Sequence, residues 1–305
     1  MRTSDLLYGL LDIKGVGNVK AAKLGRAFAH YLQWADTIPE DIIVSELEKC
    51  LSQEQITELI QKQWTAQTNP EYPQVKYINY CQDKFPDVLY ALGSDCPLQL
   101  ACMGNVSLLE SISVGFCGSR EASEKGLSIT SDVVQQLVEN GIVVVSGYAA
   151  GIDMQAHHEA LKQGGKTIIV LPEGIDCFTI KQALADVWSW ERVLVISEFA
   201  PNASWSAYRA MHRNGIIIGL SKAMFLIEAK EHSGSMDAGE KTIKQNKALY
   251  VPVYENMEDF AMGNVILLKK GAQPIKKRKD TGRANLDSAI SFLTSSSLAG
   301  SLLPL

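Results

Sequence analysis

The sequence lacks several features that would point to a particular class of protein. Its six cysteines form no C-x-x-C pair, so neither a zinc site nor a disulfide framework is indicated. It contains no run of about 18 apolar residues, which argues against a membrane-spanning helix. Residues 1–5 lead into no signal-peptide core, and we expect a cytoplasmic protein.

Positive charge is also scarce, except in one segment. The formal net charge is −5, which argues against coating of nucleic acid by bulk positive charge. Between Lys269 and Arg283, however, there are seven basic residues and one acid. A bound polyanion would therefore have to be held by a local basic patch.

The stretch from Val114 to Glu228 repeats one unit, a short apolar run followed by a helix-like segment. Apolar runs of this kind continue outside it, and the expected strands are 77–80, 98–103, 114–117, 142–145, 167–171, 193–197, 224–228 and 248–253. Helices are expected over 123–140 and 153–163. This alternation predicts an α/β fold: an extended Rossmann-like parallel sheet with helices on both faces and a ligand crevice at the strands' carboxyl ends.

The composition changes along the chain and predicts four parts. Residues 1–66 are expected to form a small helical domain, and 67–112 a connector packed on the large domain. Residues 113–275 form the Rossmann-like domain, and 276–305 a basic linker and short tail.

Three strands of the repeated unit end in turns with glycine. These turns are Gly118-Ser119-Arg120, Ser146-Gly147 with Gly151 and Asp153, and Pro172 to Asp176 with Gly174 at the centre. A strand that ends in glycine and leads into a helix presents backbone N–H groups and the positive end of the helix dipole. Phosphate is therefore the first ligand to consider.

A second glycine pattern lies near the N-terminus. Gly15 and Gly17 stand between two segments with helical apolar spacing, as in a helix-hairpin-helix or SAM-like domain. Such a turn, with Lys20 in the following helix, can contact a DNA backbone through its N–H groups. The alternative is a glycine turn with a purely structural role.

No residue cluster indicates catalysis, a metal or a cofactor. His157 and His158 lack a third metal ligand, and a histidine in the core or on a helix surface is expected. Asp153 is expected to cap its helix. Glu228, at a strand end, is a candidate partner for Arg213 or Lys222.

The order of these motifs resembles the DprA (Smf) family of bacterial DNA-processing proteins, over residues 75 to 275. The motifs that carry the resemblance are Gly118-Ser119-Arg120, Ser146-Gly147, Gly151-Ile152-Asp153, Ala156-His157, Ala160-Leu161, Ser197-Glu198, Arg213-Asn214, Gly219-Leu220-Ser221, Glu228-Ala229, Ser233-Gly234-Ser235, Gly263-Asn264 and Gly271-Ala272.

This resemblance implies single-stranded DNA binding by a homodimer that hands the strand to the recombinase RecA. It implies a basic pocket with Arg120 and Lys181, and Arg213 as a further cation. Gly118, Ser119, Asn214 and Ser233-Gly234-Ser235 belong to the same motifs. Such binding would fall steeply with salt.

The sequence departs from the family pattern at several positions. Ala150 and Gly215 each stand where the family has arginine, and Thr179-Ile180 replaces a Tyr-Pro pair. From the length of the segment Ala284 to Leu305 we expect no counterpart of the winged helix found in many relatives.

Two alternatives follow from these losses. The chain could be a regulatory relative that binds a protein, such as the antitoxin of a phage-defence toxin-antitoxin pair, with a cognate toxin as partner. An enzyme that cleaves nucleotides is the third hypothesis, although the turn at Pro172 lacks that family's second glycine.

Overall fold

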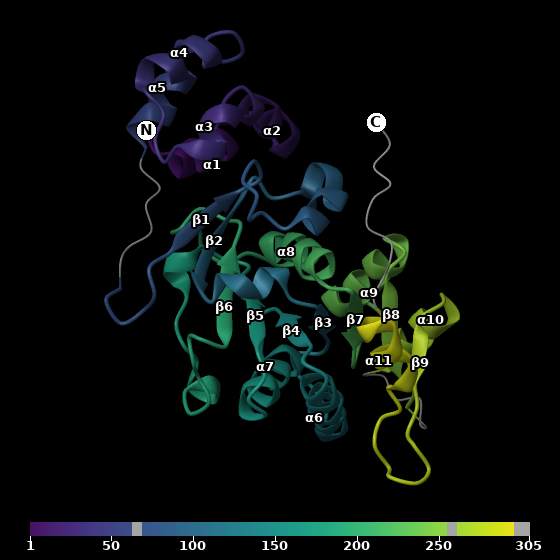
Figure 1. Cartoon of the computed structure of the whole chain (residues 1–305). Coiled ribbons are helices and arrows are strands. Elements are labelled where there is room, and N and C mark those ends of the chain that lie inside the picture. Colours follow the sequence, from purple (N-terminus) through teal and green to yellow (C-terminus); the bar gives the residue numbers. More distant parts are fainter. Residues whose placement is uncertain (63–68, 255–260, 296–305) are drawn as a thin grey trace.

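The computed structural model describes residues 1–62, 69–254 and 261–295 (Figure 1). A group of N-terminal helices lies beyond one end of a mixed α/β body. The predicted boundary at residues 66 and 67, and the last ten residues of the predicted tail, lie outside the described ranges. The division of the chain into domains therefore stays a prediction.

The N-terminal part is helical, as the apolar spacing predicts. Its helices are α1 (Thr3–Asp12), α2 (Asn18–Arg26), α3 (Ala29–Trp34), α4 (Glu40–Leu47) and α5 (Gln53–Gln61). Leu6, Leu7 and Leu10 of α1 are buried in one apolar cluster with Ile56 and Leu59 of α5. Helices this short are marginal alone, so packing of these faces stabilises them.

The glycine pattern forms the expected turn between α1 and α2. Gly15 has φ +84°, a conformation that favours glycine, and Gly17 is the N-cap of α2. A helix–turn–helix at this position is thus confirmed, while its contact with DNA stays a prediction.

The body is built on one nine-stranded sheet in the order β1-β2-β6-β5-β4-β3-β7-β8-β9. From β6 to β9 neighbouring strands are parallel, whereas β1 and β2 pair antiparallel at one end. The parallel Rossmann-like sheet is therefore confirmed. The strands are β1 (Lys76–Asn79), β2 (Gln99–Gly104), β3 (Ser113–Cys117), β4 (Val143–Ser146), β5 (Thr167–Val170), β6 (Val193–Ser197), β7 (Ala223–Leu226), β8 (Ala248–Pro252) and β9 (Gln273–Ile275).

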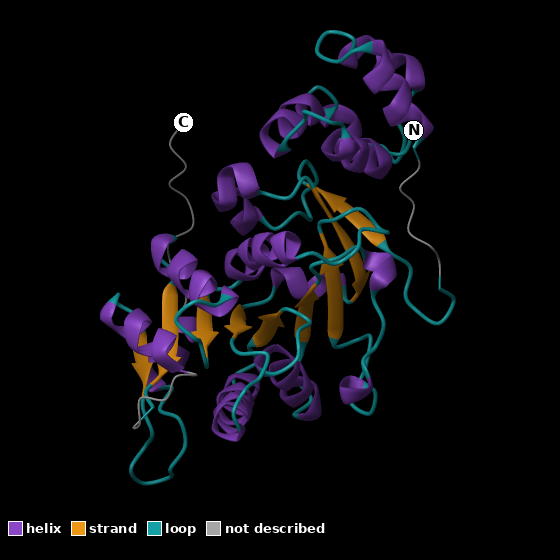
Figure 2. Cartoon of the chain, turned by 180° about the vertical axis from the view of Figure 1, so that it is seen from behind, coloured by secondary structure: helices purple, strands orange, loops and turns teal. Residues whose placement is uncertain are grey.

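Helices cover both faces of the sheet (Figure 2). On one face α6 (Glu124–Glu139), α7 (Ile152–Lys162) and α11 (Asp287–Thr294) share a buried apolar cluster. On the other face lie α8 (Ala207–Leu220), α9 (Gly234–Lys244) and α10 (Met262–Lys269), with the short helices η1 (Asp87–Asp95) and η2 (Val106–Glu110). Two single-turn helices, η3 (Ile175–Cys177) and η4 (Gln182–Leu184), follow β5.

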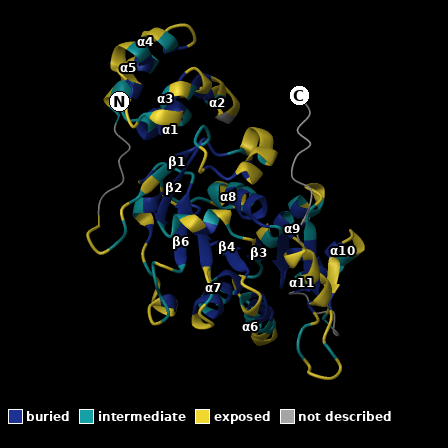
Figure 3. Cartoon of the chain, in the orientation of Figure 1, coloured by how far each residue is buried: buried dark blue, intermediate teal, exposed yellow. Residues whose placement is uncertain are grey.

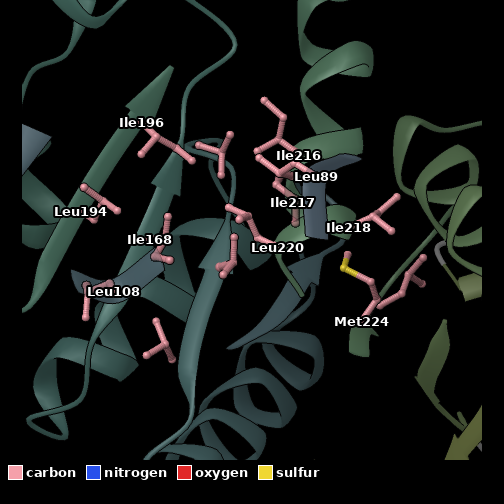
Figure 4. Packing of buried hydrophobic residues seen from close by; sticks show 14 of the residues in the cluster. Leu89, Leu108, Ile168, Leu194, Ile196, Ile216, Ile217, Ile218, Leu220 and Met224 are labelled. Atoms are coloured by element: carbon pink, nitrogen blue, oxygen red, sulfur yellow. The ribbon is translucent and has the colours of Figure 1, made fainter. Parts of the chain in front are cut away.

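The second of these cores explains why the strand runs are continuously apolar. Ile168 of β5 and Leu194 of β6 belong to the same buried apolar cluster as Ile216 and Leu220 of α8 (Figure 4). Every residue of β4, β5, β6 and β7 is buried (Figure 3), because helices exclude water from both faces.

The described part of the predicted basic linker and tail, residues 276–295, packs back onto the sheet. Leu286, Ala289 and Leu293 are buried against it. Arg283 pairs with Asp132 of α6 at 2.6 Å, and Arg278 pairs with Asp287. Some of the positive charge in this segment is thus used inside the fold.

Candidate nucleic-acid interface

A groove runs along the carboxyl edge of the sheet, where the loops after β3, β4, β5 and β7 converge. It has a larger hollow of about 490 Å³ and a smaller one of about 270 Å³. Arg120, Ala149, Trp205 and Arg213 line both, so the two hollows are continuous. The predicted site residues that line the groove are Gly118, Ser119, Arg120, Lys181, Arg213, Asn214, Ser233, Gly234 and Ser235.

Arg120 is the exposed cation at the centre of the groove. It follows β3 directly, and its Cζ lies 5.9 Å from the centre of the Trp205 ring. No ion pair of Arg120 occurs within the described residues, so the internal salt bridge that would explain it structurally is not formed there. Ser119 accepts the N–H of Glu121 at 3.1 Å and orders the turn on which Arg120 stands.

Lys181 stands on the far side of the smaller hollow. Its Nζ lies 4.3 Å from the centre of the Tyr148 ring and donates to the Tyr148 carbonyl. The Tyr148 hydroxyl in turn accepts the Lys181 N–H at 2.9 Å. An ammonium has three donors, so one bond to Tyr148 leaves capacity for a phosphate.

Arg213 faces the interior. Its side chain is buried, with the residue only 5% exposed, and Nη1 donates to the Val170 carbonyl at 2.8 Å. Its charge stands opposite the buried Asp153, and burial lowers the pKa of Arg213 while that carboxylate opposes the shift. The Nε atom has no hydrogen-bond partner among the described residues. Arg213 therefore lies in the floor of the groove, whereas Arg120 is exposed within it.

Asp153 occupies the turn after β4 where phosphate was expected. Its carboxylate accepts the Ala149 N–H and lies beside the Ser146 side chain, and burial raises its pKa against these interactions and the charge of Arg213. The expected cap is wrong, because Gly151 is the N-cap of α7 and no side chain caps that helix. The protein's own carboxylate thus takes the place of an external anion.

The glycines of these turns are required by close packing. A Cβ on Gly147 would overlap both Arg213 and Asp153, and one on Gly151, at φ +75°, would overlap the Ser119 carbonyl. Gly174 packs on the loop at 200–203, where its N–H donates to Ala203 at 2.8 Å. None of the three lines either hollow of the groove. Their first role is to let the loops approach each other.

The loop after β7 closes the other side of the larger hollow. Ser233 caps α9 by accepting the Met236 N–H at 3.2 Å, and Ser235 donates to the Gly118 carbonyl at 2.8 Å. This second bond ties the loop after β7 to the turn that carries Arg120. Asn214 of α8 is half-buried on the wall between them.

Glu228 does not hold Arg213 or Lys222, contrary to the expectation. It accepts the Ser123 N–H at 2.9 Å and is also bonded to the Ser123 hydroxyl at the start of α6. Tyr254 donates to the same carboxylate at 3.1 Å. A buried carboxylate at a helix N-terminus is favourable because it meets the positive end of the dipole.

His157 is a core residue, as expected. Its Nδ1 lies 2.6 Å from the Thr167 hydroxyl and its Nε2 lies 2.6 Å from the Gly147 carbonyl. Burial lowers its pKa to about 4. Because Gly147 begins the turn that holds Asp153, His157 supports the groove from below.

We expect this histidine to make stability depend on pH. Its folded pKa is below the unfolded value of about 6.5, so its stabilisation is complete above about pH 6.5 and lost as the pH falls to about 4. The loss should reach about 3 kcal/mol in the free energy of unfolding. Urea denaturation across this pH range measures the free energy of unfolding. Its decrease at low pH should be smaller in His157→Gln than in wild type, and the same as in wild type in the control His158→Gln. Equal losses in wild type and His157→Gln would contradict this role.

The helical hairpin lies apart from the groove lining. Gly15, Gly17 and Lys20 are exposed at the turn and first part of α2. A third hollow, of about 210 Å³, lies between the end of α1 and α8, lined by Asp12 on one side and Tyr208 on the other. The start of α8 thus lies between the groove and the N-terminal helices.

Other classes of site are not found in the described residues. No group of three histidine, cysteine, aspartate or glutamate side chains there could hold a metal ion. In the same ranges no helix has both the length and the apolar character that crossing a bilayer requires. All six cysteines are free thiols.

Comparison with known proteins decides the family. The family model for DNA recombination-mediator protein A matches residues 76–284, which include every strand of the sheet and the whole groove. The chain belongs to this family. The DNA processing protein DprA of Streptococcus pneumoniae is 29% identical over 254 residues, covering 82% of this chain and 89% of that protein.

Solved structures of family members agree with this assignment. The X-ray structure of DprA from Streptococcus pneumoniae superposes with a TM-score of 0.72 at 26% identity, covering 90% of this chain and 95% of that one. DprA from Helicobacter pylori, the subject of work on its single-stranded DNA binding mode, gives a TM-score of 0.61 at 26% identity, covering 72% and 96%.

At the two positions where the family pattern predicts arginine, the structure has room for a longer side chain. Ala150 is exposed and lines the smaller hollow. Gly215 lies within α8 next to Asn214, and a Cβ built there meets nothing within 4 Å. Of the two, only Ala150 lines the groove, where it places a short apolar side chain at a position expected from the resemblance to carry a cation.

Sequence reasoning missed the aromatic side of the groove. Trp205 lines both hollows, and Met211 of α8 lines the larger one. The only signal in the sequence was a tryptophan in an otherwise small and polar segment, residues 202–206, before the Arg213-Asn214 motif.

Proposed function

We propose that the protein binds single-stranded DNA in this groove and acts in DNA processing and recombination. The observation that carries the proposal is the exposed Arg120, free of any described ion pair, at the carboxyl edge of the sheet. Arginine forms bidentate charge-assisted hydrogen bonds with phosphate. Family membership and the single-stranded DNA binding studied in the Helicobacter pylori relative support the same ligand.

The number of unpaired cations in the groove determines how strongly salt should weaken DNA binding. Four cations and four acids line it: Arg120, Lys181, Arg213 and Lys230, with Glu121, Asp153, Glu173 and Glu228. Arg213 stands opposite Asp153, and Lys230 pairs with Glu121 at 3.6 Å. Arg120 and Lys181 remain without an ion pair, although the Glu173 carboxylate attracts Lys181. Two phosphate contacts would give a slope of log K against log salt of about −1.4. This dependence is shallower than the steep one the family resemblance implies.

The proposal is tested by titrating a labelled oligothymidylate with the protein and following fluorescence anisotropy. Wild type should bind the single strand and prefer it to a duplex of the same length, because a groove between loops fits one strand. An absence of binding at low salt would contradict the proposal.

Restoring a lost arginine should strengthen binding. Gly215→Arg adds a cation beside Asn214 at a position with space for a side chain. We expect affinity to rise roughly 3- to 10-fold and the salt slope to become more negative by about 0.7, the value for one added phosphate contact. Gly215→Ala is the matched control, since it should leave affinity unchanged while stabilising α8 by about 1 kcal/mol. Equal affinities for the two variants would contradict this position of the strand.

The partners implied by the family are part of the same proposal. A homodimer that transfers the strand to RecA would deliver the bound DNA to recombination. Sedimentation of the protein alone, and then with RecA and an oligonucleotide, tests both steps. A partner protein that co-purifies while DNA does not bind would favour the regulatory alternative.

A further inference from the structure

The start of α8 carries exposed aromatic side chains that the fold does not use. Trp205 is 51% exposed and Tyr208 is 74% exposed, although both belong to a body whose other large side chains are mostly in its cores. Met211, one turn further along, is 37% exposed. Exposed aromatic groups gathered in one place mark an interaction site more often than chance.

Trp205 stands beside Arg120, the exposed cation of the groove, whereas Tyr208 lines the neighbouring hollow between α1 and α8. Trp205 lines both hollows, and the Arg120 Cζ lies 5.9 Å from the centre of its ring. Tyr208 lies on the first turn of α8, with its ring centre 6.0 Å from that of His212. A polyanion held by Arg120 would therefore pass next to an indole face.

The backbone that presents these rings is well fixed. Ser206 caps α8 by accepting the Arg209 N–H at 3.2 Å, and Arg209 donates to the Ser204 carbonyl. The Arg209 guanidinium lies 5.6 Å from the centre of the Phe199 ring. His212 is held by Glu198 at 3.0 Å. An ordered backbone reduces the entropy that is lost when a ligand binds to the side chains it carries.

We propose that Trp205 and Tyr208 form a base-stacking platform for the single strand whose phosphates contact Arg120, an inference that rests on the proposed function. Every nucleic-acid base has a π face, so stacking binds without regard to sequence. The neighbouring cations select a polyanion over an apolar protein segment, because an apolar partner would leave Arg120 without a counter-charge.

The platform also explains how the groove works with so few cations. Two phosphate contacts provide only a shallow salt-dependent term. Stacking does not depend on salt, and one stacked base contributes roughly 5- to 150-fold in affinity. Binding at moderate salt would then depend on Trp205 as much as on Arg120.

The test compares an oligothymidylate with an abasic oligonucleotide of the same length, which keeps the phosphates and lacks the bases. Wild type should prefer the oligothymidylate by roughly 5- to 150-fold. Trp205→Ala and Tyr208→Ala should weaken oligothymidylate binding, leave abasic binding unchanged and give the same fold-loss at low and high salt. Trp205→Phe should recover most of the loss.

Trp34→Ala is the matched control, because Trp34 is 71% exposed on α3 of the N-terminal helices. It should change neither affinity. Equal binding of both oligonucleotides by wild type, or an equal loss on both in Trp205→Ala, would overturn the platform while the proposed function stands. Failure of wild type to bind either oligonucleotide would overturn both.

Discussion

Replacing Arg120 with alanine is expected to weaken binding of single-stranded DNA by roughly 10- to 100-fold. A hydrogen bond to a charged group contributes about 1.5–3 kcal/mol, and an arginine-phosphate contact is often bidentate. Arg120 is exposed and forms no ion pair within the described residues, although it attracts the buried Asp153 carboxylate at longer range. Its removal therefore takes a counter-charge away from the ligand's phosphates and breaks no ion pair within the fold. Anisotropy titration with an oligothymidylate measures the change.

Lys166→Ala is the control for loss of one positive charge. Lys166 is exposed and directly precedes β5, so it lies at the opposite edge of the sheet from the groove. Its removal should change affinity by less than about 2-fold, because it affects the ligand only through the protein's long-range electrostatic potential. If both variants lose the same affinity, binding follows net charge, and the groove is not the site.

Arg213→Ala is expected to destabilise the protein by about 3–5 kcal/mol, because it leaves the buried Asp153 carboxylate without its counter-charge. The two groups lie on either side of Gly147, where even a Cβ would overlap both. Urea denaturation measures the free energy of unfolding. Arg120→Ala serves as the control, since removal of an exposed arginine should change stability by less than about 0.5 kcal/mol.

The pair can be tested further by removing both charges. Arg213→Met combined with Asp153→Ala leaves no isolated buried charge, so it should cost less than the two single substitutions together. Strict additivity, or a loss below about 1 kcal/mol for Arg213→Ala, would show that the two groups are not coupled.

Much of the fold follows from local sequence. The strands from β3 to β8 are continuous apolar runs bounded by polar or glycine residues, and burial on both faces makes such runs obligatory. β9 was not predicted. It has three residues, with Pro274 at its centre and two exposed positions, and it exists because β8 provides a parallel partner. Pairing with a neighbouring strand cannot be read from the spacing of apolar residues within three positions.

The site was predictable in part. Arg120 follows a strand that must end at the carboxyl edge, which places it in the crevice. The burial of Arg213 could also have been predicted, because it falls on the same helical stripe as Ile217 and Leu220, which face the sheet. The filling of the turn after β4 by Asp153 could not, since a carboxylate at that spacing is equally suited to a helix cap.

The most direct measurement is the salt dependence of oligothymidylate binding by wild type, Arg120→Ala and Lys181→Ala. If both cations contact phosphates from the groove, each substitution should reduce the steepness of log K against log salt by about 0.7. Lys166→Ala should leave the slope unchanged. Identical slopes for all four proteins would show that neither groove cation meets a phosphate, and would contradict the account.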